Sequence, residues 1–225
     1  MARLRAPKPR KRPTQTRSQA TVDAMLEAAA RILVRDGYGT FTTNRVAAAA
    51  GVSVGSLYQY FPNKEALLAE LKARHIAQIE RGLEAALEHA AETPLARLVP
   101  ALVDAMAAAH LIEPELHRVL SAEVPHLGSS DAAEAFERRT FARMRALLAA
   151  RRGEVVVRHL DLAVYVLVRT VEGTIHEAVV ERPEELASGA ISREVTRLLL
   201  GYLTGTPAVS ARARPTRRRP SRHAG

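Results

Sequence analysis

The chain has 225 residues and contains no cysteine, which excludes disulfide bonds, thiolate metal sites and cysteine nucleophiles. No apolar run approaches the roughly 20 residues that a membrane helix needs. The basic N-terminus also lacks the apolar stretch of a secretory signal peptide. The sequence therefore predicts a soluble, cytoplasmic protein that has no membrane partner.

Acidic residues are missing from both ends of the chain. Residues 1–19 carry seven lysines and arginines and residues 205–225 carry six arginines, whereas the whole chain has a net charge of +9, so the middle is mildly acidic. Basic tails attract polyanions, and nucleic acid is the first candidate. We expect residues 1–17 and 205–225 to be disordered basic tails. A purely solubilising role for these tails is the alternative.

Signals for β-strands are nearly absent. The only run of β-branched residues is Val155 to Val157, whereas apolar residues recur at helical spacing almost everywhere else. The sequence therefore predicts an all-α protein of about nine helices. In the first half of the chain, the expected helices run from about residue 22 to Gly37, from Thr42 or Thr43 to Gly51, and over about 54–61 and 64–91. In the second half, one helix starts at Thr93-Pro94 and is kinked at Pro100, and another runs from Pro114 to Pro125. The last three cover about 131–150, 159–182 and 190–203.

Residues 42–64, which read TTNRVAAAAGVSVGSLYQYFPNK, predict a helix-turn-helix unit. Two short helices flank a glycine turn, Ser53 can cap the second helix, and small alanines let the two helices pack closely. Such a unit places its second helix in the major groove of DNA. That helix begins with short side chains and then offers hydroxyl and amide groups to phosphates and bases. The alternative is a plain helical hairpin in a core, which does not explain why these polar side chains occur on consecutive turns.

The segment from about Ser18 to Leu71 resembles the DNA-binding domain of the TetR family of repressors. The matching residues are Asp36 to Tyr38, Phe41 to Thr43, Ala50 to Tyr58 and Tyr60 to Leu68. The resemblance implies a three-helix DNA-binding domain over 18–64 and a larger helical domain over 65–204 that binds an effector and dimerises. Together with the residue pattern, it predicts DNA contacts at Thr42, Thr43, Asn44, Arg45, Ser53, Val54, Gly55, Ser56, Tyr58, Gln59, Tyr60 and Lys64.

Beyond about residue 75 the resemblance is confined to the pattern of helices, so candidates for an effector pocket come from the residues alone. A mainly apolar cavity would suit an apolar or aromatic small molecule. Each candidate has an alternative role in the core or on a solvated face. The candidates are Met106, His110, His117, Phe136, Phe141 and Met144, and the polar stripe Tyr165, Arg169, Glu172 and His176.

The last two long helices are the expected dimer interface, because the resemblance implies it and because both carry broad apolar faces. Isologous packing would form a four-helix seam across a two-fold axis. The candidate interface residues are Val164, Val168, Val171, Val195, Leu198, Leu199 and Tyr202.

Two motifs suggest catalysis but lack the context that it requires. Gly51 to Gly55 fits the pattern of a hydrolase nucleophile elbow, but a helix precedes the serine where a strand is needed. His176-Glu177 has no second ligand at the spacing of a zinc-protease helix. We therefore expect no catalytic residues, no metal site and no cofactor, and the protein is not expected to be an enzyme.

The sequence favours a transcriptional regulator that binds double-stranded DNA as a homodimer. The expected form is a ligand-released repressor on a near-palindromic operator. The alternative is a DNA-organising protein that uses its basic tails without sequence preference. The sequence identifies neither the operator nor the effector.

Overall fold

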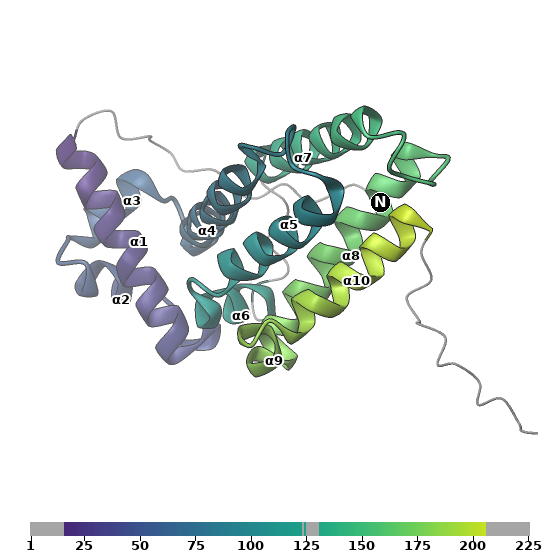
Figure 1. Ribbon diagram of the computed structural model, residues 1–225. Coiled ribbons are helices and arrows are strands. Elements are labelled where there is room, and N and C mark those ends of the chain that lie inside the picture. Colours follow the sequence, from purple (N-terminus) through teal and green to yellow (C-terminus); the bar gives the residue numbers. More distant parts are fainter. Residues whose placement is uncertain (1–15, 123, 125–130, 206–225) are drawn as a thin grey trace, which may run out of the picture.

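The computed structural model describes residues 16–122, 124 and 131–205, and over these ranges the regular structure is helical throughout. The all-α prediction is confirmed. Figure 1 shows α1, α2 and α3 at one end of the molecule, with α7, α8 and α10 at the other. The elements are α1 (Thr16–Asp36), η1 (Tyr38–Thr40), α2 (Thr43–Ala49), α3 (Val54–Tyr60), α4 (Lys64–Leu87), α5 (Leu95–His110), α6 (Pro114–Ala122), α7 (Asp131–Ala150), α8 (Leu160–Glu181), α9 (Pro183–Ala187) and α10 (Ala190–Thr204).

The ends of most helices lie where the cap signals place them. Gly37 ends α1 with a φ of 73°, a conformation that favours glycine. Thr42 rather than Thr43 caps α2. The Ser53 hydroxyl accepts a hydrogen bond from the Ser56 N–H (3.0 Å), and the Asn63 side chain accepts one from the Ala66 N–H (2.8 Å). These side chains satisfy N–H groups that the first helical turn leaves without partners.

Four features differ from the expectation. The helix α1 begins at Thr16, before residue 22 and inside the segment 1–17 that was expected to be a disordered tail. The helix α4 ends at Leu87 and not near 91, and Pro94 rather than Thr93 precedes α5. The Leu95 N–H donates to the Glu154 carboxylate (3.2 Å), which a distant loop supplies. The short helix α9 was not expected, because Pro183 was interpreted only as a stop. Proline is compatible with a first helical turn, where its missing N–H would have no partner.

Some expected features lie outside the described residues. They are the tails 1–15 and 206–225, the helix end at Pro125, and the side chain of Asp131.

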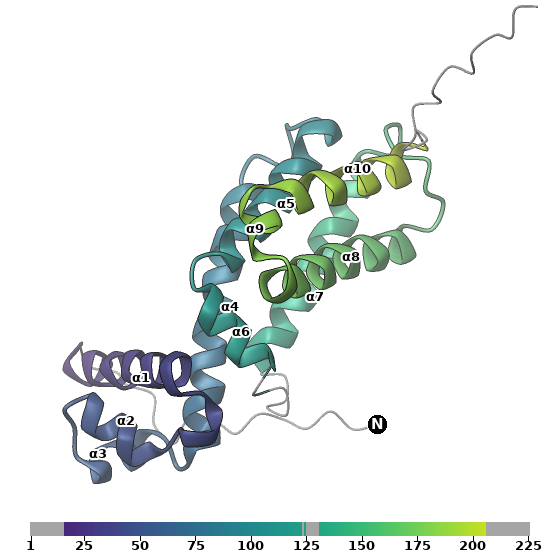
Figure 2. The same cartoon turned by 90° about the horizontal axis from the view of Figure 1, so that it is seen from below.

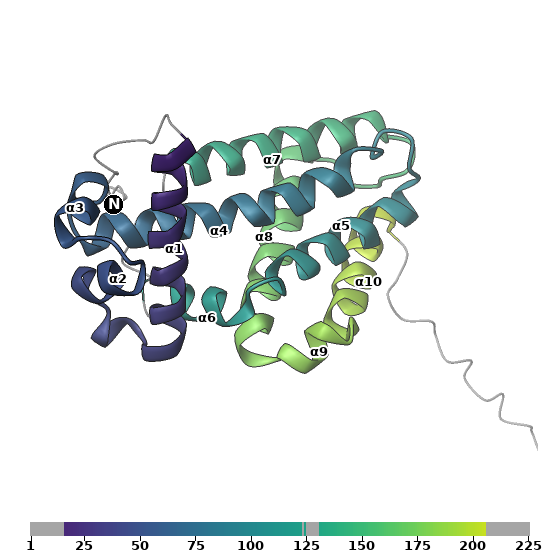
Figure 3. The ribbon, with the colours of Figure 1, turned by 90° about the vertical axis from the view of Figure 1, so that its left-hand side faces the viewer.

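The first hydrophobic core extends beyond the three N-terminal helices. Leu67, Leu68 and Leu71 at the start of α4 are buried in it, and α6 contributes Leu116 and Val119. Figures 2 and 3 show α4 running from this end of the molecule into the other, with α1 crossing it. The helix α4 therefore belongs to both halves, and the packing has no boundary at residue 64.

The second half packs α5 against α8 and α10, and α7 against α8. Its main core contains Val103 of α5, Val164 of α8 and Leu199 of α10. No single helix in the described ranges is long and apolar enough to span a membrane. The pair of α5 and α6, bent by 82° at their junction, reaches that length and composition only when the two are combined.

The buried side chain of Arg151 holds the connection between α4 and α5. Its guanidinium donates to the carbonyls of Ala91 and Thr93 (3.0 Å each) and also to that of Ala90. Arg151 follows α7, so this single side chain joins the far end of α7 to the turn that reverses the chain. The backbone carbonyls of this connection, which lies outside both helices, gain donors from one side chain.

Candidate nucleic-acid interface and interior cavities

A tight turn docks α3 on α2. Gly51 adopts a φ of 68°, which side chains other than glycine rarely tolerate, and the following Val52 N–H donates to the Ala47 carbonyl (3.0 Å). Val46, Ala47 and Leu57 are fully buried between the two helices and the rest of the core. The outer side of α3 is therefore presented on a fixed support.

The exposed face of α3 carries the short and polar side chains that the sequence assigns to DNA. Val54 and Tyr58 are 38% and 41% exposed, and Gly55 and Gln59 are exposed beside them. At Gly55 the nearest atom to an added Cβ would be the Ser53 hydroxyl oxygen at 3.8 Å, so the helix surface is open there. This face has the size, shape and hydrogen-bonding groups to enter a major groove.

The other predicted contacts fall into two groups around this face. Thr42 and Asn44 are exposed at the start of α2, and Ser53 is exposed at the start of α3, where its hydroxyl lies 2.8 Å from that of Ser56. Thr43 is buried instead, and its hydroxyl lies 3.2 Å from the Tyr58 hydroxyl, so it holds Tyr58 in position. Tyr60 packs partly against the core. Thr43 and Tyr60 therefore support the surface more than they form it.

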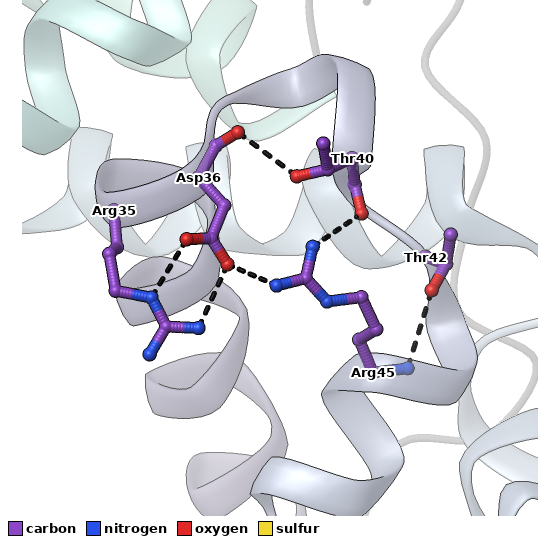
Figure 4. Close-up of polar contacts among 5 residues, drawn as sticks. All are labelled: Arg35, Asp36, Thr40, Thr42 and Arg45. Atoms are coloured by element: carbon purple, nitrogen blue, oxygen red, sulfur yellow. Dashed lines mark hydrogen bonds and ion pairs between the residues drawn. The ribbon is translucent and has the colours of Figure 1, made fainter.

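Arg45, a predicted DNA contact, lies in an internal network that Figure 4 shows. Its guanidinium donates to the Thr40 carbonyl (2.9 Å) and to the Asp36 carboxylate, which also accepts two bonds of 2.8 Å from Arg35. The Arg35 hydrogen bonds, and then the charges of both arginines, lower the pKa of Asp36 to about 2. Because its charge is balanced, Arg45 ties α2 to the end of α1.

Lys64 is the first residue of α4 and lies at the edge of the same face. Its ammonium nitrogen lies 4.5 Å from the centre of the Tyr38 ring, a favourable cation–π contact. The aromatic ring fixes a positive charge at a helix N-terminus, where free N–H groups already favour a phosphate.

Two adjoining cavities lie in the second half of the molecule. An apolar cavity of about 100 Å³ is lined by leucine, valine and methionine side chains of α4, α5, α7, α8 and α10. A more polar cavity of about 430 Å³ lies next to it, between α4, α5, α6, α7 and α8. Both share Met106, Thr140 and Val168 as wall residues.

The structure separates the ten predicted pocket residues into those that line a cavity and those that do not. Phe141, Tyr165 and Arg169 line neither cavity, because they form an outer cluster in which Arg169 lies 5.6 Å from the Phe141 ring centre and bonds to Glu137. The other seven line one or both cavities: Met106, His110, His117, Phe136, Met144, Glu172 and His176.

Four histidines from four helices meet in the polar cavity. His75, on α4, was not predicted, and its Nε2 lies 3.0 Å from Nδ1 of His117 on α6. His110 on α5 and His176 on α8 complete the cluster, with the rings of His117 and His176 centred 4.3 Å apart. Desolvation by burial lowers the pKa of His110 to about 4 and that of His117 to about 3, and it also lowers the pKa of His75 and His176. All four imidazoles are therefore neutral near pH 7.

The predicted dimer residues divide in a similar way. Val164, Val195 and Leu199 are buried inside their own chain, and Val168 and Val171 line the apolar cavity. Leu198 and Tyr202 are exposed on α10. The sequence analysis missed an exposed apolar stripe on α8, which consists of Leu162, Val166, Gly173 and Val180.

Comparison with known proteins follows the same division of the chain. The family model of the bacterial regulatory proteins of the tetR family matches residues 25–71. The model described as Tetracyclin repressor-like, C-terminal domain, matches residues 94–203. Together the two matches cover most of the chain. A search of curated protein sequences finds no match.

Solved structures share the fold at low sequence identity. A TetR-family transcriptional regulator from Mesorhizobium loti superposes with a TM-score of 0.64 at 19% identity, over 84% of this chain and 97% of that one. SmeT, the repressor of a Stenotrophomonas maltophilia multidrug efflux pump, gives 0.59 at 22%, over 85% and 94%. The Bacillus subtilis regulator FadR, solved with stearoyl-CoA, gives 0.62 at 21%, over 80% and 98%.

Proposed function

The chain belongs to the TetR family and is a DNA-binding transcriptional regulator, and we propose that it acts as a ligand-released repressor that binds a near-palindromic operator as a dimer. The observation that carries the proposal is the exposed face of α3 on its docked support. Members of this family are transcriptional regulators and not enzymes. Membership therefore favours sequence-specific regulation over non-specific DNA packaging by the basic tails.

The proposed reading surface consists of the first two turns of α3 and the start of α2. Gly55 lets the helix approach base edges closely, and Gln59 offers an amide that can pair with adenine. Thr42, Tyr58 and Lys64 are suited to phosphate oxygens around this centre. These contacts fix the register of the helix in the groove, and Gln59 supplies base preference.

The proposed dimer interface is the apolar stripe on α8 together with Leu198 and Tyr202 of α10. Gly173 lies in the middle of the α8 stripe with no atom within 4 Å of an added Cβ. Glycine inside an exposed helix costs about 1 kcal/mol relative to alanine. Close approach of a partner helix would offset that cost. A two-fold seam here places two α3 helices at half-sites about one turn of DNA apart, or a multiple of it.

The proposed effector has an apolar or aromatic body that enters the apolar cavity. FadR, with a similar fold, was solved with stearoyl-CoA, a ligand that has a long apolar chain. The helix α4 lines both cavities through Leu83 and Ile79, and its first turns pack in the DNA-binding core. An effector that binds better to one position of α4 would change the spacing of the two α3 helices.

Binding of purified variants to a near-palindromic operator at physiological salt tests the DNA-binding proposal. The operator is a fragment that the wild-type protein itself selects from genomic DNA. We expect Tyr58→Phe to weaken binding roughly tenfold or more, because it removes a hydroxyl from the DNA surface and from Thr43. Tyr165→Phe, which removes an exposed hydroxyl far from α3, is the matched control and should bind like the wild type. Equal affinity for all three proteins would contradict the proposal.

The effector proposal has its own test. Apolar and aromatic compounds that raise the melting temperature of the protein are added at saturation to the protein–operator complex. Release of the operator is expected for at least one of them. A compound that binds the apolar cavity and leaves operator affinity unchanged would contradict release by that compound.

A further inference from the structure

Three of the clustered histidines come from different helices and are far apart in sequence. His110, His117 and His176 each offer a ring nitrogen, and these nitrogen atoms lie within 4.8 Å of one another. His110 and His117 are 4% and 3% exposed, so the group is sheltered from solvent on most sides. Its open side faces the polar cavity, which all three residues line.

The hydrogen bonds around the cluster prepare two of these rings to act as ligands. Nδ1 of His110 lies 2.8 Å from the Met106 carbonyl, which can only accept, so in the neutral ring Nδ1 carries the proton and Nε2 a lone pair. Nδ1 of His117 is engaged with His75, and Nε2 of His117 is buried without a hydrogen-bond partner. Metal-binding histidines usually donate their second N–H to a carbonyl or a similar acceptor.

We propose that His110, His117 and His176 bind a divalent transition-metal ion of the Zn²⁺ class, with the remaining coordination position open to the polar cavity. Neutral imidazoles suit Zn²⁺, Cu²⁺ and Ni²⁺, and three histidines plus one open position is a known zinc arrangement. A tetrahedral zinc with Zn–N bonds of 2.0–2.1 Å sets its ligand atoms about 3.4 Å apart, so ring nitrogens that now lie within 4.8 Å of one another need only small side-chain movements to bind it.

Two ring nitrogens of the cluster, Nδ1 of His75 and Nε2 of His117, are buried without a hydrogen-bond partner, and the ion gives the second of them a partner. With the metal on Nε2 of His117, its Nδ1–H donates to Nε2 of His75, and the proton positions in the pair become fixed. His75 is thus a positioning residue that orients a ligand from α4. The cavity wall also carries the carboxylates of Glu137 and Glu172, both paired with Arg169, and the ammonium of Lys72.

This site goes beyond the proposed function, since metal binding requires neither DNA nor an apolar effector. It was also missed by the sequence analysis, which looked for ligands at short spacing on one helix. His110 and His117 are seven residues apart across the turn between α5 and α6, and α8 supplies His176 from far along the chain.

The test is metal titration of the full chain after treatment with a chelator. Calorimetry with Zn²⁺ should give one ion per chain with a dissociation constant in the micromolar range or tighter. Co²⁺ as a spectroscopic probe should produce the intense visible absorption of a four-coordinate ion. A folded, chelator-treated protein that binds no Zn²⁺ saturably would overturn the proposal.

Variants locate the ion. His176→Gln, at the least buried of the three positions, and His117→Gln should both abolish the one-ion binding and the Co²⁺ spectrum. His75→Leu should weaken affinity roughly 10–100-fold while leaving the stoichiometry at one. His89→Gln, at an exposed histidine, is the matched control and should bind like the wild type. Circular dichroism in chelator verifies that each variant folds. Full binding by a folded His176→Gln protein would overturn the assignment.

Discussion

Gly55 is the residue where the needs of stability and of DNA recognition oppose each other most clearly. It lies in an α-helix, is exposed, and has room for a methyl group, so nothing in the folded chain requires glycine there. Alanine favours a helix over glycine by up to about 1 kcal/mol. Glycine at position 55 is explained if the surface of α3 must come within contact distance of DNA bases.

We therefore predict that Gly55→Ala raises the melting temperature or leaves it unchanged and weakens operator binding roughly tenfold or more, since the methyl group holds α3 away from the base edges. Thermal unfolding and operator titration on the same preparation measure both quantities. Wild-type affinity in this variant would contradict close approach at Gly55.

Arg151 shows how one buried residue can fix a connection. Its guanidinium donates to the carbonyls of Ala90, Ala91 and Thr93 in the connection between α4 and α5. Replacement by an apolar side chain leaves one buried and two partly buried acceptors without this donor, and the loss at a buried acceptor costs about 1–3 kcal/mol.

The corresponding prediction is that Arg151→Met lowers the free energy of unfolding by about 3 kcal/mol in chemical denaturation. Arg97→Met, at an exposed arginine of α5, is the control and should change it by less than about 0.5 kcal/mol. Similar losses in the two variants would mean that the network around Arg151 is not stabilising.

At the scale of elements, the sequence located the helices better than it located their faces. N-caps such as Ser53 and Asn63 are local signals, so the first residues of α3 and α4 were predictable from neighbouring residues. The helix α8 carries apolar residues on more than one side. One side packs on its own chain, and another is apolar although it is exposed. Periodicity alone could not tell Val164, which is buried, from Val166, which is exposed.

The exposed faces of α8 and α10 make a prediction about assembly. Leu198→Glu should convert the proposed dimer to a monomer at micromolar concentration, because it places a charge in the proposed apolar seam. Ile112→Glu is the matched control, since Ile112 is 59% exposed and Leu198 56%, but Ile112 follows α5 and lies outside the seam. Sedimentation velocity distinguishes the two states. A dimeric Leu198→Glu protein would place the interface elsewhere.

At the scale of the whole molecule, the DNA-binding unit and the cavities share structure. The helix α6 packs in the N-terminal core through Leu116 and Val119 and also carries His117 into the polar cavity. The helix α4 does the same with Leu68 and His75. Two helices therefore connect the cavity to the N-terminal core in which Leu57 of α3 is buried.

These connections explain what the sequence could and could not predict. The helix-turn-helix unit is contiguous over about twenty residues, so its motif was readable, although the roles of Thr43 and Arg45 depended on partners on other helices. The histidine cluster joins four helices, and no local pattern brings His75 to His117. Sites assembled from distant segments require the packing of the whole fold.

The most direct measurement is selection of genomic fragments by the purified full-length protein at physiological salt. Sequence-specific reading by paired α3 helices predicts recovery of a few near-palindromic fragments, with half-sites separated by about one helical turn or a multiple of it. The Gly55→Ala protein should lose these fragments. Recovery of fragments without sequence preference, with a steep salt dependence and equal yield from Gly55→Ala, would contradict specific reading by α3.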